Sequence, residues 1–197
     1  MILDTHRPVW MTDDLDDVQT LVRTFLDKEV VPHLARWSEQ RAADRDLWRV
    51  AGAAGLLCLS IPEEYGGSGG TFAHEAVLTY EQGRVGDDAW ANVVHSSIVA
   101  HYILAYGTEQ QKQRWLPAMA SGDLVGAIGM TEPGTGSDLQ QVRTKARREG
   151  DEYVINGSKT FISNGTHCDL IVLVARTSDE PGGKGLSLIV VETKGLE

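Results

Sequence analysis

The chain has 197 residues, of which 42% are hydrophobic and 23% charged, values typical of a globular protein with one large or two small domains. Its 28 acidic residues outnumber the 18 basic ones and give a net charge of −10, which argues against a nucleic-acid-binding protein because such proteins need a basic face. The longest apolar run, residues 170–175, is far too short for a membrane span.

The 2 cysteines lie far apart in the chain and belong to no C-x-x-C motif, so reduced thiols are expected. The N-terminal residues lack the basic start and apolar core of a signal peptide. Both features favour a cytoplasmic protein.

The first part of the chain, residues 1–122, has the spacing of amphipathic helices. Pro32 ends or bends the first helix, and Thr108 with Gln111 forms a capping box for the last. The fourth is apolar on nearly every face, which predicts a central position among the others. The predicted helices span residues 13–30, 44–54, 71–85, 88–104 and 109–120.

After residue 125 the apolar period falls to about two, which predicts strands. Two Asn-Gly pairs, at 156–157 and 164–165, have the composition of hairpin turns, and Glu149-Gly-Asp151 is a further turn. The predicted strands span residues 142–148, 153–155, 159–163, 169–176 and 186–192.

The predicted fold class is therefore α+β, with an N-terminal all-helical domain over residues 1–122 and an antiparallel β-domain over residues 123–197. The sequence stops just after a strand, so the sheet is expected to have an unpaired edge. We expect the β-domain to be incomplete, either because the sequence is cut short or because another chain completes it.

A glycine-rich loop, Pro133-Gly-Thr-Gly-Ser-Asp138, lies at the seam of the two parts. It lacks the third glycine of a dinucleotide fingerprint and the Gly-Lys-Ser/Thr of a P-loop. The residue types leave two interpretations open. One is an ordinary β-turn. The other is a ligand loop in which Gly134 and Gly136 let backbone N–H groups approach an anion or a flavin edge, while Thr131 and Ser137 add hydroxyl donors.

Met130-Thr-Glu-Pro-Gly-Thr-Gly-Ser-Asp138 resembles the signature of the acyl-CoA dehydrogenase family. Three further stretches, residues 61–67, 106–117 and 156–165, resemble other motifs of that family, in the family's order. The resemblance covers nearly the whole chain but only about the first half of a complete member. Its details lean toward the long-chain-like branch.

The resemblance implies an all-helical N-terminal domain, a middle β-domain and a C-terminal four-helix domain that is absent here, usually in homo-oligomers. It implies FAD as cofactor and an acyl-CoA thioester as substrate. A carboxylate removes the α-proton while the β-hydride passes to flavin N5, and electrons leave through an electron-transferring flavoprotein.

The resemblance also assigns site residues by position. Thr131 is expected to hydrogen-bond the polar edge of the flavin, and Ser137 to lie near both FAD and the CoA arm of the substrate. Phe161 and Ser163 take places usually held by tryptophan and threonine, which keeps an aromatic plane and a hydroxyl donor. The expected cofactor contacts are Ile128, Met130, Thr131, Gly136, Ser137, Phe161, Ile162 and Ser163.

No catalytic base is assigned to this chain, because the family's carboxylate belongs to the C-terminal domain. Glu132 is interpreted as a structural hydrogen-bonding partner at the turn, and the histidines show no metal spacing. Two alternatives stay open. The same scaffold serves flavin oxidases and monooxygenases, and the chain could be a non-catalytic truncated product or partner subunit.

Overall fold

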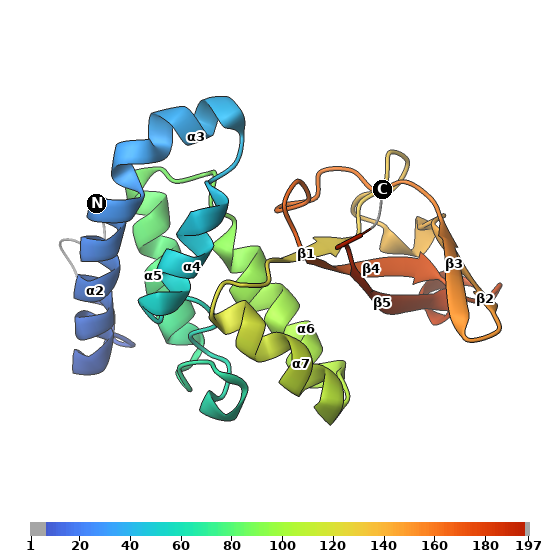
Figure 1. The fold of residues 1–197 in the computed structure, drawn as a ribbon, viewed down its shortest axis with the longest axis horizontal. Coiled ribbons are helices and arrows are strands. Elements are labelled where there is room, and N and C mark those ends of the chain that lie inside the picture. The colour runs from blue at the N-terminus through green and yellow to red at the C-terminus, as the bar shows by residue number, and fades with distance from the viewer. Residues whose placement is uncertain (1–6, 196–197) are drawn as a thin grey trace. The chain divides into compact units, whose positions relative to one another are not determined.

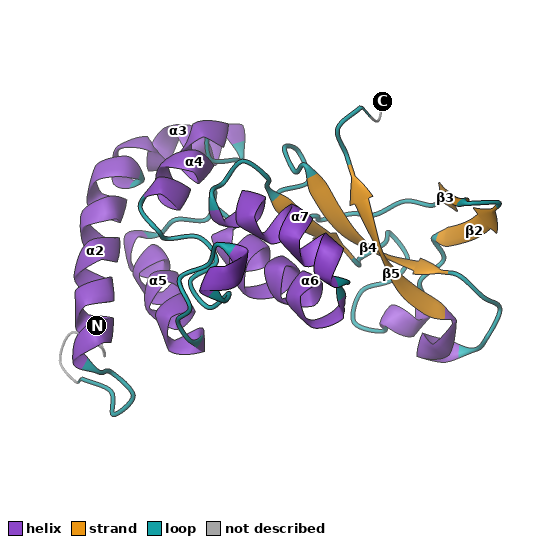
Figure 2. Ribbon diagram, turned by 60° about the horizontal axis from the view of Figure 1, so that its bottom comes forward, coloured by secondary structure: helices purple, strands orange, loops and turns teal. Residues whose placement is uncertain are grey.

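A computed structural model describes residues 7–195 and divides the chain into two compact units, one ending at Leu124 and the other beginning at Val125. The α-helices belong to the first unit and the strands to the second (Figures 1 and 2). None of the described helices is both long and apolar enough to cross a membrane.

The helical unit contains six α-helices among the described residues, together with a π-helix that runs directly into one of them. The helices are α2 (Asp13–Glu29), α3 (Leu34–Gln40), α4 (Arg45–Ala53), α5 (Phe72–Val85), the π-helix Val93–Val99, α6 (Ala100–Tyr106) and α7 (Glu109–Ala120).

The predicted helix ends are mostly confirmed, with two differences. The capping box of α7 is present, with the Gln111 amide donating to the Thr108 hydroxyl over 3.3 Å. Pro32 does end the first helix, but it lies in a short 3-10 turn that leads into α3, which the periodicity missed. The predicted helix 88–104 begins later and is a π-helix over its first part.

Aromatic and ionic contacts join the helices. The ring of Trp90 lies 5.9 Å from that of Phe25 on α2 and 6.1 Å from that of Trp48 on α4. The fully buried carboxylate of Glu81, on α5, pairs with Arg23 of α2 over 3.0 Å and with Arg84 of its own helix. This buried charge is therefore neutralised, as a buried ion must be.

Two glycines of this unit should respond oppositely to a methyl group. Gly122 has a φ of 77°, and a Cβ there would lie 2.1 Å from the Trp48 carbonyl oxygen, so Gly122→Ala should destabilise the unit by about 2–3 kcal/mol. Gly83, inside α5, has open space where a Cβ would sit, so Gly83→Ala should stabilise it by about 0.5–1 kcal/mol. Urea unfolding followed by tryptophan fluorescence measures both, and shifts of the same sign would contradict the described backbone contact.

The second unit is a five-stranded sheet whose central strand is β4 (Leu170–Arg176). Its other strands are β1 (Gly126–Gly129), β2 (Lys145–Glu149), β3 (Glu152–Asn156) and β5 (Leu186–Glu192). β1 pairs with β4 in parallel, β5 pairs with β4 antiparallel, and β2 joins β4 in parallel at one position while forming a hairpin with β3. Among the described strands, β5 pairs with β4 alone.

The prediction of a wholly antiparallel sheet is wrong, because β1 and β2 both run parallel to β4. The long connection between β1 and β4 contains the β2–β3 hairpin and lets the chain return in the same direction. The hairpin turn at Gly150, with φ 64°, is where the sequence places it.

The predicted strand 159–163 and the turn at 156–157 are also wrong. Residues 157–169 contain no strand, because Lys159 and Thr160 bond to the loop after β1 and Phe161 has a φ of 57°. Gly157 makes a close approach rather than a turn, since a Cβ there would lie 2.3 Å from the Thr144 hydroxyl oxygen.

Candidate functional site

The loop that follows β1 is shaped by hydrogen bonds within itself. The Glu132 amide donates to the Thr135 carbonyl over 2.9 Å, and the Thr135 amide returns a bond of 3.0 Å, which closes a tight turn around Pro133 and Gly134. The Thr135 hydroxyl donates to the Gln141 carbonyl over 3.0 Å. The loop is therefore a defined structure, with Thr135 buried beneath it.

The buried carboxylate of Glu132 is the anchor of this loop. It accepts hydrogen bonds from the Arg143 amide at 2.8 Å, the Thr144 amide at 2.9 Å and the Thr144 hydroxyl at 2.6 Å. It also pairs with the Lys159 ammonium at 2.9 Å. The interpretation of Glu132 as a structural hydrogen-bonding partner is confirmed by these contacts.

These contacts keep Glu132 ionised. Burial by itself raises the pKa of the carboxyl. The hydrogen bonds from Thr144, the Arg143 amide and Lys159 together lower the pKa by more than burial raises it, and the net result is a pKa of about 2. A carboxylate that holds its charge this firmly does not act as a proton acceptor near neutral pH. Glu132 is therefore a poor candidate for a catalytic base.

The segment after β3 is bonded directly to the loop. The Lys159 ammonium donates to the Met130 carbonyl over 2.9 Å, and the Thr160 amide donates to the Thr131 carbonyl over 3.0 Å. Two motifs almost thirty positions apart therefore lie side by side, with Met130 and Thr131 against Lys159 and Thr160.

Phe161, the next residue, has an unusual conformation for an aromatic side chain. Its φ of 57° is in the left-handed region, and its relative exposure is 91%. A bulky residue in this region costs about 1–3 kcal/mol, and outliers of this kind gather at functional sites. The chain gains no burial for Phe161 in return, so its ring is exposed to solvent.

The far end of this segment is tied back to the sheet. The Asn164 side-chain amide donates to the Gly126 carbonyl over 3.1 Å, and the Gly165 amide donates to the Ile162 carbonyl over 3.0 Å. Asn164 also has a positive φ, of 64°, as the sequence signal at 164–165 predicts for a turn. Ile162 is half-buried, whereas Ser163 is exposed.

The loop glycines satisfy the steric requirement for a nearby ligand. A Cβ at Gly134 or Gly136 would meet no atom within 4 Å, and neither glycine has a positive φ. Neither backbone conformation nor contact within the chain thus demands glycine at these positions. A side chain at either position would extend into open space.

Only some of the expected site residues are joined to one another by hydrogen bonds in the structure. Ile128, on β1, is half-buried and precedes Met130 and Thr131, which the hydrogen bonds above join to residues 159–161. Gly136 and Ser137 are exposed on the other limb of the loop, and no described hydrogen bond joins them to that segment. Lys159, which the sequence places in a predicted strand, was missed as a functional residue, and its polar neighbours Ser158 and Thr160 give no local sign of its buried ion pair.

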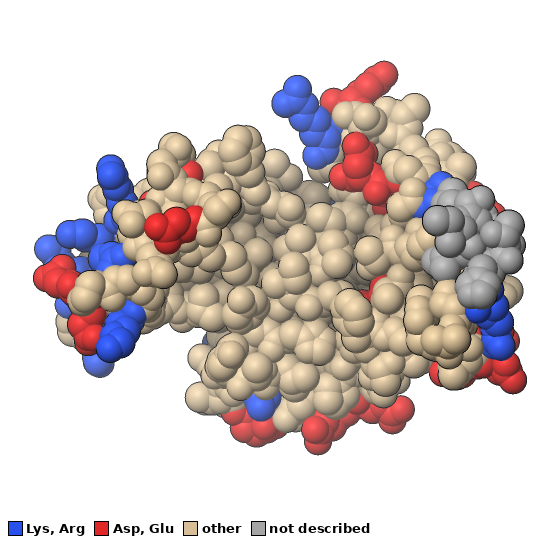
Figure 3. All heavy atoms as spheres, turned by 180° about the vertical axis from the view of Figure 1, so that it is seen from behind, with Lys and Arg blue, Asp and Glu red and all other residues tan. Residues whose placement is uncertain are grey.

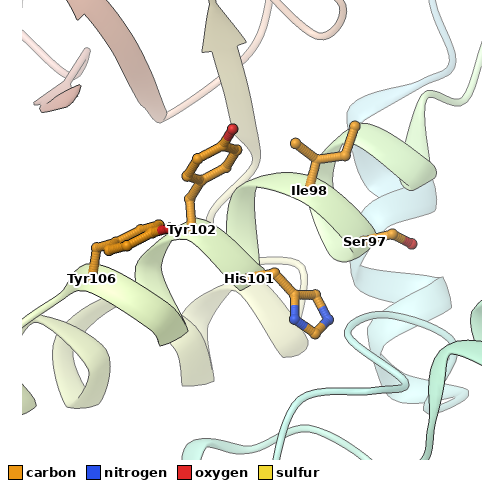
Figure 4. A pocket seen from close by; sticks show the side chains of 5 residues that line it. All are labelled: Ser97, Ile98, His101, Tyr102 and Tyr106. Atoms are coloured by element: carbon orange, nitrogen blue, oxygen red, sulfur yellow. The ribbon is translucent and has the colours of Figure 1, made fainter. Parts of the chain in front are cut away.

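A second feature lies in the helical unit, where a shallow cavity of about 300 Å³, largely open to solvent, follows the π-helix and α6. Figure 4 shows Ile98 and Tyr102 pointing to one side of the helix and Ser97 and His101 to another. His101 Nε2 lies 2.8 Å from the Ser60 hydroxyl, which donates to the buried Glu75 over 3.0 Å. The cavity therefore has an apolar side and a polar, hydrogen-bonded side.

Charges elsewhere are mixed. On the face drawn in Figure 3, basic side chains lie beside acidic ones and do not form an extended basic surface. Among residues 7–195, no group of three or more His, Cys, Asp or Glu side chains could hold a metal ion.

Comparisons with known proteins agree with this geometry. The family model for the acyl-CoA dehydrogenase N-terminal domain matches residues 12–123, and that for the middle domain matches residues 127–197. The chain therefore belongs to the acyl-CoA dehydrogenase family, which is FAD-dependent.

The mouse mitochondrial long-chain specific acyl-CoA dehydrogenase is 44% identical over 173 residues, which cover 87% of this chain and 40% of the mouse protein. The crystal structure of an acyl-CoA dehydrogenase from Geobacillus kaustophilus has a TM-score of 0.91 and 41% identity, covering 94% of this chain and 50% of that chain. A glutaryl-CoA dehydrogenase from Mycobacterium smegmatis, solved in complex with FADH2, has a TM-score of 0.87 and 31% identity, covering 98% and 48%. The chain thus spans about half the length of these relatives or less.

Proposed function

We propose that this chain supplies part of the flavin and CoA site of an FAD-dependent acyl-CoA dehydrogenase that desaturates an acyl-CoA thioester between its α and β carbons. The observation that carries the proposal is Phe161, a strained and exposed aromatic residue that directly follows Thr160, whose amide donates to the Thr131 carbonyl. When bound, FAD supplies the hydride acceptor, flavin N5. The chain's own part is to hold and orient the ring and to exclude water from it.

The described residues fit a flavin. Phe161 offers the plane of its ring, and the Thr131 and Ser163 hydroxyls offer hydrogen-bond donors for polar atoms of the isoalloxazine edge. Ile128, Met130 and Ile162 are half-buried and supply apolar surface. Gly136 leaves room for close approach, and Ser137 is proposed to contact both FAD and the CoA arm.

The remaining features of the proposal follow from family membership. The acyl tail is proposed to lie along the cavity beside the π-helix and α6, and substrates of the long-chain type are favoured. The boundary between the helical and sheet domains in the sequence is proposed at residues 122–123, two positions before the division between the two compact units. Electrons are proposed to leave through an electron-transferring flavoprotein, from a cytoplasmic homo-oligomer.

We expect this chain alone to bind FAD weakly, with a Kd above about 1 μM. It should also show no dehydrogenase activity, because no catalytic base is assigned to it. FAD fluorescence titration measures the binding, and anaerobic addition of acyl-CoA tests for bleaching of the bound flavin. Because the proposed contacts are to the ring, FMN should compete with FAD whereas ADP should not.

The outcomes separate the alternatives. Competition by ADP but not by FMN, or the absence of saturable FAD binding, would contradict the proposal that this chain contacts the flavin ring. Bleaching by acyl-CoA would show that this chain holds its own base. Rapid reaction of the reduced, bound flavin with oxygen would favour an oxidase or a monooxygenase.

A further inference from the structure

The two segments proposed to face the flavin are joined by one buried ion pair. The side chains of Lys159 and Glu132 retain 9% and 6% of their exposure, and their charged atoms lie 2.9 Å apart. Lys159 belongs to the segment after β3, and Glu132 to the loop after β1. Burying two charges costs free energy unless each charged group has well-placed hydrogen-bonding partners. The burial of this pair therefore depends on the particular contacts that surround it.

Lys159 does more than neutralise Glu132. Its ammonium also donates to the Met130 carbonyl over 2.9 Å, which fixes the peptide group that precedes Thr131. The carbonyl of Thr131 itself accepts from the Thr160 amide over 3.0 Å. The peptide groups on both sides of Thr131 are therefore held, and with them the direction of its side chain.

The same contacts constrain the residue on the opposite segment. Lys159 and Thr160 directly precede Phe161, whose left-handed φ of 57° is unfavourable for an aromatic residue. A strained conformation persists only where its surroundings impose it. On the N-terminal side of Phe161, the bonds at Lys159 and Thr160 can do so, and on its C-terminal side the Ile162 carbonyl accepts from the Gly165 amide.

We propose that Lys159 and Glu132 are a positioning pair that sets Thr131 and Phe161 in their flavin-binding arrangement before the cofactor arrives, an inference that rests on the proposed function. Lys159 touches neither the ring nor the substrate in this role. It acts through the peptide before Thr131 and through the backbone that leads to Phe161. Preorganisation of this kind contributes to affinity because the ordering cost is met during folding.

A comparison of two variants tests the role. Lys159→Met removes the side-chain bonds between the segments, whereas Thr144→Val removes another hydrogen bond to the same Glu132 oxygen and no hydrogen bond of residues 159–161. In the cofactor-free chain, hydrogen exchange at the Thr160 amide should accelerate at least about 10-fold in Lys159→Met and remain slow in Thr144→Val. Equal exchange in Lys159→Met and the parent chain would overturn the proposal.

FAD titration adds a second readout, which is measured under conditions where each variant is folded. Lys159→Met should lower FAD affinity about 10-fold or more and weaken the absorbance change of the bound flavin, while Thr144→Val should change affinity less than about 3-fold. Equal losses in the two variants would mean that the pair is merely structural. If the parent chain binds no FAD, the proposed function fails, and the exchange experiment still judges whether the pair positions the two segments.

The double variant Lys159→Met/Glu132→Gln provides a second check in case the single variant does not fold. It removes both charges, so no uncompensated ion is buried. We expect it to fold, to retain fast exchange at the Thr160 amide and to bind FAD as weakly as Lys159→Met. Recovery of parental affinity would show that charge balance, rather than positioning, is what the pair provides.

Discussion

Glu132→Ala should destabilise the sheet unit by about 3–5 kcal/mol, the range typical of breaking a buried ion pair from one side. The substitution leaves the Arg143 and Thr144 amides without their acceptor and the Lys159 ammonium without its counter-ion, with the Met130 carbonyl as its remaining acceptor. Hydrogen exchange of the β4 amides, residues 170–176, measures the effect on this unit. Tryptophan fluorescence serves as an internal control, because the 5 tryptophans all precede residue 116.

A loss of stability confined to the tryptophan signal, or no change in β4 exchange, would contradict the anchoring role of Glu132.

The pH dependence of the stability that Glu132 contributes gives a further check. The pKa of this carboxyl is about 2 in the folded chain, below the ordinary value of 4.5, so its contribution is present above pH 4.5 and is lost as the pH falls toward 2. The Glu132→Gln variant should lack this part of the acid destabilisation, which amounts to roughly 3 kcal/mol.

Phe161→Gly should have opposite effects on stability and on cofactor binding. Glycine adopts a φ of 57° without strain, so the sheet unit should gain about 1 kcal/mol, visible as slower exchange of the β4 amides. FAD affinity should fall about 10- to 100-fold, because the aromatic plane and its apolar surface are lost. Such a trade between stability and function is common where strain is retained at a binding site.

Arg41→Gly is the matched control for this prediction. Arg41 also has a left-handed φ, of 60°, and is exposed, but it ends α3 in the helical unit. The substitution should stabilise the helical unit and leave FAD affinity unchanged. If Phe161→Gly kept parental affinity, Phe161 would not be part of the flavin wall, whatever its conformation.

Local signals in the sequence predicted much of the helical unit. The Thr108–Gln111 capping box is decided by neighbours in the chain, and the structure contains it. α3 was missed because Pro32 was interpreted only as a terminator, whereas proline also suits the first turn of a new helix.

Features that depend on distant residues were harder to predict. The parallel pairing of β1 with β4 joins segments more than forty positions apart, and its one local sign was the continuous apolar run 170–175, typical of a central strand. The conformation of Phe161 and the role of Lys159 depend on the loop at residues 130–132, so alternation alone led to the wrong prediction of a strand. The motif resemblance, by contrast, named residues in both segments, and the structure joins these segments through bonds at Lys159 and Thr160.

The most direct test of the proposed flavin contacts is a titration of FAD into the isotope-labelled chain, followed residue by residue by NMR. The amide signals of Thr131, Gly136, Phe161 and Ser163 should shift in a saturable manner with a common Kd, and FMN should shift the same signals. Saturable shifts confined to other residues, or the absence of shifts at Thr131 and Phe161 while FAD binds, would contradict the account.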